Sequence, residues 1–453
     1  MRSLGQALRA TVVLPSLAAI GLLAGRPAQA ADPAQVAVIT LSMTPVAAID
    51  PHLFGVNYVW HLVPGDRFDE FSTAMRDVAH ATTVRYPGGW AAEWLDWASN
   101  EERGGTVEPE APGIDADGFL SRVENASFVT PSAAAIRDPA QTGALVDTVT
   151  GLVRRYGGRV KTWEIGNEWW LQRGAKNDST VRRQNLEAYA ALVAALAPAM
   201  KAVDPTIEIY PTGDWTRPEE FAILRRLAGA AAWDRIYGIS IHPYCGVAEE
   251  ETLCSWLPKR TAAIRAVTGK TRIFASEWSL GQRVNPDSFG IRNANQLVTA
   301  IRTLAEAGLS AAAYWPPVKA VPAIAFVSAD YRRPFANGLL FGWMSRHYRG
   351  EALPAKGDLP AAAARSGEGT TVFVASMAGG ARTVRIPLVG TGLSRVVSAE
   401  VLFSQEPDDL QRSRLAEFAL LPTTVREGAV EFGLNPGTPG RGRGWEIARV
   451  TLR

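Results

Sequence analysis

Short apolar runs alternate with longer amphipathic segments from about residue 50 to residue 315. A short run of apolar or β-branched residues predicts a buried strand, and apolar residues at positions i, i+3, i+4 and i+7 predict a helix with one buried face. The clearest helical stripe is formed by Leu186, Tyr189, Ala190, Leu192, Val193 and Leu196. The predicted strands are residues 53–57, 82–86, 126–130, 161–165, 207–211, 238–242, 272–275 and 310–314.

Helices are predicted between most of these strands. They are residues 66–79, 116–124, 138–156, 181–203, 218–232, 258–267 and 292–307. Eight strands that alternate with helices over about 270 residues are typical of a (β/α)8 TIM barrel, a fold of the α/β class. A doubly wound open sheet is the alternative, but no G-x-G-x-x-G motif follows the first strand and no P-loop is present.

The periodicity changes after Trp315, where several prolines follow. Residues 333–346 predict one more helix that closes the barrel, and beyond residue 350 strand-like alternation replaces helical spacing. These later strands are residues 370–376, 383–388, 396–403, 429–433 and 445–452. They predict a C-terminal antiparallel β-sandwich domain over residues 348–453, after a barrel over residues 46–347. Residues 31–45 contain one further strand, which we expect to join the sandwich.

The first 30 residues have the pattern of a secretory signal peptide. Arg2 and Arg9 accompany an apolar stretch that is too short to cross a bilayer, and Ala28-Gln29-Ala30 matches a cleavage site. An uncleaved membrane anchor is the alternative. The excess of Arg (40) over Lys (7) indicates a GC-rich bacterial genome. We therefore expect a secreted or periplasmic protein with no membrane contact after signal cleavage.

Charge and cysteine content narrow the possible functions. Lys plus Arg (47) nearly equals Asp plus Glu (45), which argues against nucleic acid as a partner. Two cysteines exclude a disulfide framework, but in an oxidising compartment Cys245 and Cys254 could pair instead of remaining free thiols. No histidine pair has H-x-H or H-x-x-x-H spacing, so we expect no metal and no cofactor.

Two carboxylates follow strands of the predicted barrel. Active sites of such barrels lie at the C-terminal ends of the strands. Gly166-Asn167-Glu168 follows the fourth strand and Ser276-Glu277 follows the seventh, so both glutamates should point toward the barrel axis. A single glutamate at a strand end is more often part of an ion pair at the rim. A pair of carboxylates, however, is the minimal apparatus for cleaving a glycosidic bond.

Other strand ends are also polar or rich in tryptophan. Arg85 lies in the second strand, and His242 and Tyr244 lie at the end of the sixth. The chain has 14 tryptophans, more than its tyrosines (10) or methionines (6). Ten of them follow predicted strands: Trp60, Trp90, Trp94, Trp97, Trp169, Trp170, Trp215, Trp256, Trp278 and Trp315. Flat apolar rings with an N–H donor suit the C–H faces of sugars, so this clustering favours a carbohydrate ligand.

Four motifs occur in order on strands two, four, six and seven: R-Y-P-G-G-W, W-E-I-G-N-E-W, I-H-P-Y and S-E-W. Together they resemble the clan A retaining glycoside hydrolases, most closely the α-L-arabinofuranosidase family with a barrel and an appended β-sandwich. The resemblance implies that Glu168 is the general acid/base and Glu277 the nucleophile. It also implies that Asn167 binds the sugar 2-hydroxyl. His242 would support the acid/base or a sugar hydroxyl.

The same resemblance implies that Arg85 and Tyr244 hold the nucleophile. The substrate-binding residues that we expect are Arg85, Asn167, His242, Tyr244, Trp90, Trp169, Trp278 and Trp315. A retaining enzyme places its two carboxyl groups about 5–5.5 Å apart, whereas an inverting one separates them by about 6.5–9.5 Å. We predict the shorter spacing.

The sequence thus predicts a secreted retaining glycoside hydrolase that acts on poly- or oligosaccharides by double displacement and is α-L-arabinofuranosidase-like. The segment 130–138 is shorter than in that family, and the stretch after Trp315 is rich in proline. A β-xylosidase or an endo-β-glycanase of the same clan therefore stays open, as does a non-catalytic carbohydrate-binding protein. We expect the sandwich to stabilise the barrel, and carbohydrate binding by it is the alternative. The oligomeric state is open.

Overall fold

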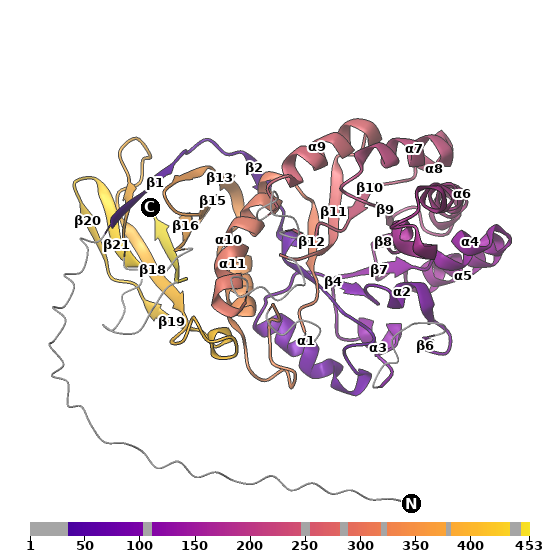
Figure 1. Ribbon diagram of the computed structural model, residues 1–453, viewed down its shortest axis with the longest axis horizontal. Helices are drawn as coiled ribbons and strands as arrows, with labels where there is room; N and C mark the ends of the chain where they lie inside the picture. Colours follow the sequence, from indigo (N-terminus) through magenta and orange to yellow (C-terminus); the bar gives the residue numbers. More distant parts are fainter. Residues whose placement is uncertain are drawn as a thin grey trace, which may run out of the picture. The chain divides into compact units, whose positions relative to one another are not determined.

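The computed structural model describes residues 35–102, 111–245, 254–280, 289–318, 324–376, 382–434 and 445–453. The predicted signal peptide over residues 1–30 lies outside the described residues. The described chain contains a barrel and a two-sheet β-sandwich (Figure 1). Both parts of the predicted fold are therefore confirmed.

Eight parallel strands close the barrel, each hydrogen-bonded to the next and the last to the first. In order around the barrel they are β3 (Gly55–Asn57), β4 (Val84–Tyr86), β7 (Ala126–Thr130), β8 (Thr162–Ile165), β9 (Glu208–Gly213), β10 (Gly238–Ile241), β11 (Arg272–Trp278) and β12 (Ala311–Tyr314). All eight coincide with predicted strands to within a few residues. Since parallel strands are covered on both faces, their near-continuous apolar runs are the expected signature.

Helices surround these strands (Figure 1). They include α1 (Phe68–Asp77), α3 (Ala116–Leu120), α5 (Thr142–Tyr156), α6 (Ser179–Val203), α7 (Pro218–Ala228), α9 (Leu257–Thr268), α10 (Gly290–Glu306) and α11 (Ala336–His347). Short helices occupy connections: α2 (Ala91–Trp94), α4 (Ala133–Arg137) and α8 (Ala230–Trp233). The single helix predicted over residues 218–232 is interrupted because Gly229, with φ of 79°, ends α7.

Helix α6 is long and apolar enough to cross a membrane by length and composition alone. Its predicted stripe, including Leu186, Leu192 and Leu196, is buried, and the helix packs against α5 and α7. These contacts are those of a core helix, which passes the same length test.

The sandwich consists of two sheets. One contains β14 (Ala355–Gly357), β1 (Gln35–Leu41), β17 (Arg382–Pro387), β21 (Ala429–Leu434) and β20 (Thr423–Arg426). The other contains β19 (Glu417–Leu420), β18 (Val396–Phe403), β22 (Ile447–Leu452), β16 (Gly369–Ala375), β15 (Ala361–Ser366), β13 (Gly350–Leu353) and β2 (Ala47–Ile49). The sandwich is not purely antiparallel, because β1 runs parallel to β17.

The N-terminal strands belong to the sandwich beyond the boundary that we expected at residue 45. Strand β2 pairs with β13, so Ala47–Ile49 lies in the seven-stranded sheet. Helices α10 and α11 of the barrel pack against this sheet. Trp343 of α11 meets Phe373 of β16 edge-on at 5.3 Å between ring centroids. A buried contact of this kind couples the stability of the two domains.

Candidate active site

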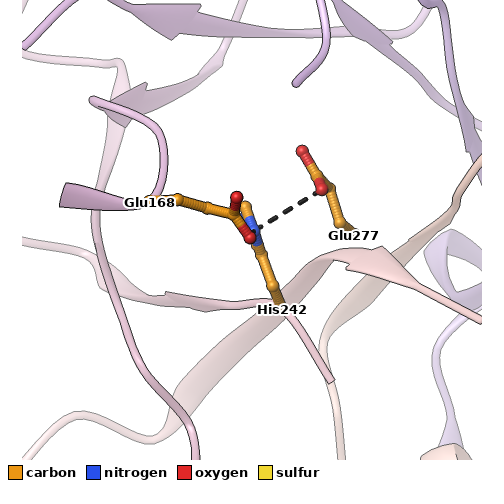
Figure 2. A group of neighbouring side chains, drawn as sticks. All are labelled: Glu168, His242 and Glu277. Carbon is orange, nitrogen blue, oxygen red and sulfur yellow. Dashed lines mark hydrogen bonds and ion pairs between the residues drawn. The ribbon is translucent and has the colours of Figure 1, made fainter. Parts of the chain in front are cut away.

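Glu168 and Glu277 come together at the C-terminal end of the barrel. Glu168 follows β8, and Glu277 lies in the last part of β11. One carboxylate oxygen of each and a ring nitrogen of His242 lie within 4.8 Å of one another (Figure 2). Three such ligand atoms could share a cation, but both oxygens of Glu277 already accept hydrogen bonds from Arg85 and Tyr244.

A sharp turn after β8 positions Glu168. Gly166 has φ of 70°, and a Cβ atom there would lie 2.5 Å from the Ser132 hydroxyl, so only glycine fits. Glu168 itself is left-handed, with φ of 46° and ψ of 47°. A non-glycine residue in this region is strained, and such strain is concentrated at functional sites. The turn aims the Glu168 carboxylate toward Glu277 (Figure 2).

Glu277 is held as a buried, ionised carboxylate. Only 3% of its surface is exposed. Arg85 Nη1 donates to Oε1 at 2.7 Å, and the Tyr244 hydroxyl donates to Oε2 at 2.5 Å. Burial acts to raise the pKa of Glu277, but His242, Arg85 and Tyr244 together hold it below its usual value. The group is therefore negatively charged at neutral pH, which suits the nucleophile role predicted for it.

Arg85 is fully buried and joins four strands of the barrel. Besides Glu277, its guanidinium donates to Glu164 at 2.6 Å and to the side-chain oxygens of Asn57 and Asn167 at 3.0 Å each. Burial acts to lower the pKa of Arg85, but Glu164 and Glu277 raise it above its ordinary value. A guanidinium held by this many acceptors is rigid and permanently charged, so it orients Glu277.

Asn167 presents an unused donor. Because its side-chain oxygen accepts from Arg85, its amide nitrogen points elsewhere. That nitrogen is buried and has no hydrogen-bond partner among the described residues. A buried donor without a partner costs free energy unless a ligand satisfies it. This geometry suits the predicted contact between Asn167 and a sugar hydroxyl.

His242 lies between the two carboxylates. Its Nδ1 atom is 3.0 Å from Glu168 Oε1 and 3.6 Å from Glu277 Oε2 (Figure 2). Burial acts to lower the pKa of His242, but the two carboxylates outweigh it and raise the pKa above its usual value. A protonated imidazole here lessens the repulsion between the carboxylates. The ring of Trp170 packs edge-on against it at 5.6 Å.

Glu93 was missed in the sequence, although it supports the turn that carries Glu168. Its Oε2 accepts from the backbone N–H groups of Ser132 at 2.6 Å and Ala133 at 2.7 Å. Its Oε1 accepts from the Ser132 hydroxyl at 2.8 Å and from the backbone N–H of Asn167. The carboxylate thereby ties together the connections that follow β4, β7 and β8.

Two of the four tryptophans predicted to bind substrate are buried. Trp169 and Trp278 are 1% and 0% exposed. Trp169 stacks on Tyr189 and donates to the Thr212 carbonyl, and Trp278 packs edge-on against Tyr314. Both rings are packed in the barrel, and their contact with substrate stays a prediction.

The other two predicted tryptophans remain accessible. Trp90 is 40% exposed, and Trp315 is half-buried. Trp315 lies against the Gly88-Gly89 turn after β4, where a Cβ atom on Gly89 would come within 2.3 Å of the ring. The two glycines therefore make room for this indole. Trp90 and Trp315 are the tryptophans of the predicted set with exposed ring surface.

Cys245 and Cys254 form a disulfide with an S–S distance of 2.01 Å. The bond lies immediately after Tyr244, which forms an isolated parallel bridge with Ser279. The backbone N–H of Cys245 also donates to the Ser279 carbonyl at 2.9 Å. The disulfide closes the connection that follows Tyr244 and is therefore adjacent to the site.

Neither known family models nor curated protein sequences match this chain. Solved structures do share its fold. A family 51 arabinofuranosidase from Xanthomonas axonopodis pv. citri has a TM-score of 0.65 at 16% identity, covering 93% of this chain and 100% of that one. A family 51 α-L-arabinofuranosidase from Bifidobacterium longum has a TM-score of 0.64 at 16% identity, covering 92% and 99%.

A family 44 xyloglucanase from Paenibacillus polymyxa is also similar, with a TM-score of 0.61 at 14% identity, covering 92% of this chain and 99% of that one. The barrel with its sandwich is therefore an architecture found in clan A glycoside hydrolases. Within that class, the resemblance extends to arabinofuranosidases of family 51 and to glycanases of family 44.

Proposed function

We propose that this protein is a retaining glycoside hydrolase in which Glu277 is the nucleophile and Glu168 the general acid/base. The observation that carries the proposal is the short separation of the two carboxylates, with oxygens within 4.8 Å. A short separation supports a retaining mechanism, since an inverting enzyme needs room for a water molecule between its carboxyl groups.

In the first step, Glu277 attacks the anomeric carbon while the glycosidic bond breaks. Glu168 donates its proton to the departing oxygen, so the leaving group departs as a neutral alcohol. Arg85 and Tyr244 keep Glu277 ionised and oriented until the ester bond forms. The glycosyl ester neutralises the charge on Glu277.

In the second step, water replaces Glu277 on the anomeric carbon. Glu168, now a carboxylate, accepts a proton from this water, and the Glu277 carboxylate is released. The proton on Glu168 is thereby restored. Two displacements on opposite faces leave the anomeric configuration unchanged. His242 contacts both carboxylates. It therefore offsets the negative charge, which lies on Glu277 before the first step and on Glu168 after it.

We propose an α-L-arabinofuranoside-like substrate, because four strand-end motifs and the fold point to that family. An endo-β-glycanase is the second candidate, favoured by the structural likeness to a xyloglucanase. We also propose that the protein is exported. The N-terminal 30 residues support this, as does the Cys245–Cys254 disulfide, because such bonds persist in oxidising compartments.

A panel of 4-nitrophenyl glycosides tests the proposal, with α-L-arabinofuranoside, β-D-xyloside and β-D-glucoside as its first members. We expect turnover of at least one by the wild-type protein. Glu277→Gly should lower kcat more than about 10³-fold. Glu168→Ala should lower it by about 10²–10⁴-fold on substrates with poor leaving groups.

Glu208→Gln is the matched control, because Glu208 begins β9 at the opposite end of the barrel. It should retain wild-type turnover. Unchanged turnover by Glu277→Gly would contradict the assignment. Oligosaccharide binding without turnover of any glycoside would instead support a carbohydrate-binding protein.

A further inference from the structure

A cavity of about 560 Å³ lies between the barrel and the sandwich. One wall is the connection after β12, with Val327, Arg333 and Phe335. The other is a sandwich segment around the short 3-10 helix η5 (Arg412–Arg414). We call this cavity the arginine pocket and define it by Arg333, Phe335, Arg412, Arg414 and Leu415.

The pocket lies at the same end of the barrel as the two carboxylates. Its barrel wall belongs to the connection that leaves the C-terminal end of β12, and the backbone N–H of Phe326 donates to the Pro317 carbonyl at 2.8 Å. That contact joins the wall to Pro317, which is two residues after Trp315 in the sequence. On the sandwich side, Ser413 lies against Gly290, the first residue of α10, which follows β11.

The described charged side chains that line the arginine pocket are all positive. Its described lining contains three arginines and no carboxylate. Arg412 is paired outside the pocket, with Glu406 at 2.9 Å. No described acid forms an ion pair with Arg333 or Arg414. Burial lowers the pKa of Arg414, and no carboxylate offsets this effect.

Contacts within the protein fix the Arg414 guanidinium before any ligand binds. Its guanidinium lies over the ring of Phe335 at 4.8 Å, and it also donates to the backbone and side chain of Gln411. An arginine fixed in this way loses little side-chain entropy when it binds an anion. Its planar fork matches the two oxygens of a carboxylate or a sulfate.

The remaining lining is mainly apolar, apart from Ser328 and Gln411. The exposed carbon surface beside the guanidinium groups comes from Leu415, which is 40% exposed, because Val327 and Phe335 are only 1% and 7% exposed. Such surfaces suit the C–H face of a sugar ring, whereas a free inorganic anion would gain nothing from them. The volume lies in the usual range for small-molecule sites.

We propose that the arginine pocket binds an anionic sugar residue of the substrate, through the carboxylate of a uronic acid or the oxygens of a sulfate ester. The inference rests on the proposed glycoside hydrolase function. It makes the β-sandwich a part of substrate recognition, since Arg412 and Arg414 come from that domain. The substrate class becomes an acidic rather than a neutral polysaccharide.

Binding of free monosaccharides to the wild-type protein tests this without requiring turnover, since they contain no glycosidic bond. D-Glucuronate and its neutral analogue D-glucuronamide form a matched pair, and glucose 6-sulfate distinguishes the two anion sources. By titration calorimetry or ligand-observed NMR, we expect at least one anion to bind ten-fold more tightly than the amide. Tighter binding of glucuronate indicates uronic acids, and tighter binding of glucose 6-sulfate indicates sulfated sugars.

Arg333→Met and Arg414→Met should each weaken anion binding at least five-fold. Arg426→Met, on exposed strand β20, is the matched control and should bind like the wild type. Equal affinity for glucuronate, glucose 6-sulfate and the amide would overturn the proposal, and so would wild-type anion binding by both pocket variants. Neither result bears on glycoside hydrolysis by Glu277, which the 4-nitrophenyl glycosides measure separately. Failure of the two proposals can therefore be distinguished.

Discussion

The hydroxyl of Tyr244 donates a 2.5 Å hydrogen bond to Glu277 Oε2. Burial and the adjacent carboxylate raise the pKa of Tyr244 well above its usual value, so the hydroxyl remains protonated and can donate. Together with Arg85 on Oε1, it leaves Glu277 with both oxygens bound and its charge stabilised. In the proposed mechanism, this makes Glu277 a nucleophile that is ionised before substrate arrives, and the pH dependence of the proposed reaction follows from it.

Tyr244→Phe should move the acid limb of the pH profile to higher pH. The proposed mechanism requires ionised Glu277, whose pKa is below its usual value, so activity should fall as pH decreases through that pKa. Loss of a hydrogen bond to a charged group costs about 1.5–3 kcal/mol, or about one to two pH units. The pH dependence of kcat/KM measures this shift.

Tyr348→Phe is the matched control, because the Tyr348 hydroxyl is buried without a described hydrogen-bond partner and lies outside the site. Its acid limb should coincide with that of the wild type. An unchanged limb in Tyr244→Phe would show that this hydroxyl does not set the charge of Glu277.

Glu93→Gln should slow catalysis although Glu93 is not placed to touch substrate. All four groups that face its oxygens are donors, so the NH2 group of glutamine would oppose an N–H. The turn that carries Glu168 should shift, and a displacement of about 1 Å costs on the order of 10²-fold in rate. We expect a lower kcat with KM changed by no more than about three-fold.

Ser132→Ala is a graded companion, since it removes only one of the four donors to Glu93. Its loss of kcat should be smaller than that of Glu93→Gln. Thermal unfolding of both variants separates slow chemistry from loss of fold. A wild-type kcat in Glu93→Gln would show that Glu93 does not position Glu168.

Trp90 and Trp169 should respond differently to removal. Trp90→Ala should raise KM for a glycoside with little change in stability, because the ring is 40% exposed. Trp169→Ala should lower the free energy of unfolding by about 3–5 kcal/mol, because it empties a packed volume. Michaelis kinetics and urea unfolding measure the two effects. A raised KM with unchanged stability in Trp169→Ala would show that the Trp169 ring binds substrate.

The disulfide should stabilise the connection after Tyr244. A bond that closes a loop of about ten residues contributes about 2–3 kcal/mol by restricting the unfolded chain. The Cys245→Ala/Cys254→Ala double variant should lose this amount in urea unfolding. A reductant should destabilise the wild type and leave the double variant unchanged. Equal sensitivity of both proteins to reductant would contradict this role.

The apolar pattern predicted the barrel well, because parallel strands buried on both faces produce short continuous apolar runs. It predicted the end of the seventh strand too early. Residues 272–275 were expected, but β11 continues to Trp278, since Ser276 and Glu277 are polar and nevertheless buried. Strand β19 was missed because all four of its residues are exposed and show no alternation.

The candidate site also contains residues that the sequence predicts and residues that it does not. Glu168 and Glu277 could be predicted because strand ends of a barrel converge on one face. Glu93 could not, because it lies in a four-residue helix without periodicity and acts through connections from three strands. A position after a strand also does not determine which way a ring turns, so the burial of Trp169 and Trp278 could not be predicted.

The stereochemistry of the first product tests the central claim most directly. An aryl glycoside that the wild-type protein hydrolyses should be followed by proton NMR before the released sugar mutarotates. Because we propose double displacement by Glu277 and Glu168, the first anomer should have the same configuration as the substrate. An inverted first anomer would contradict Glu277 as nucleophile.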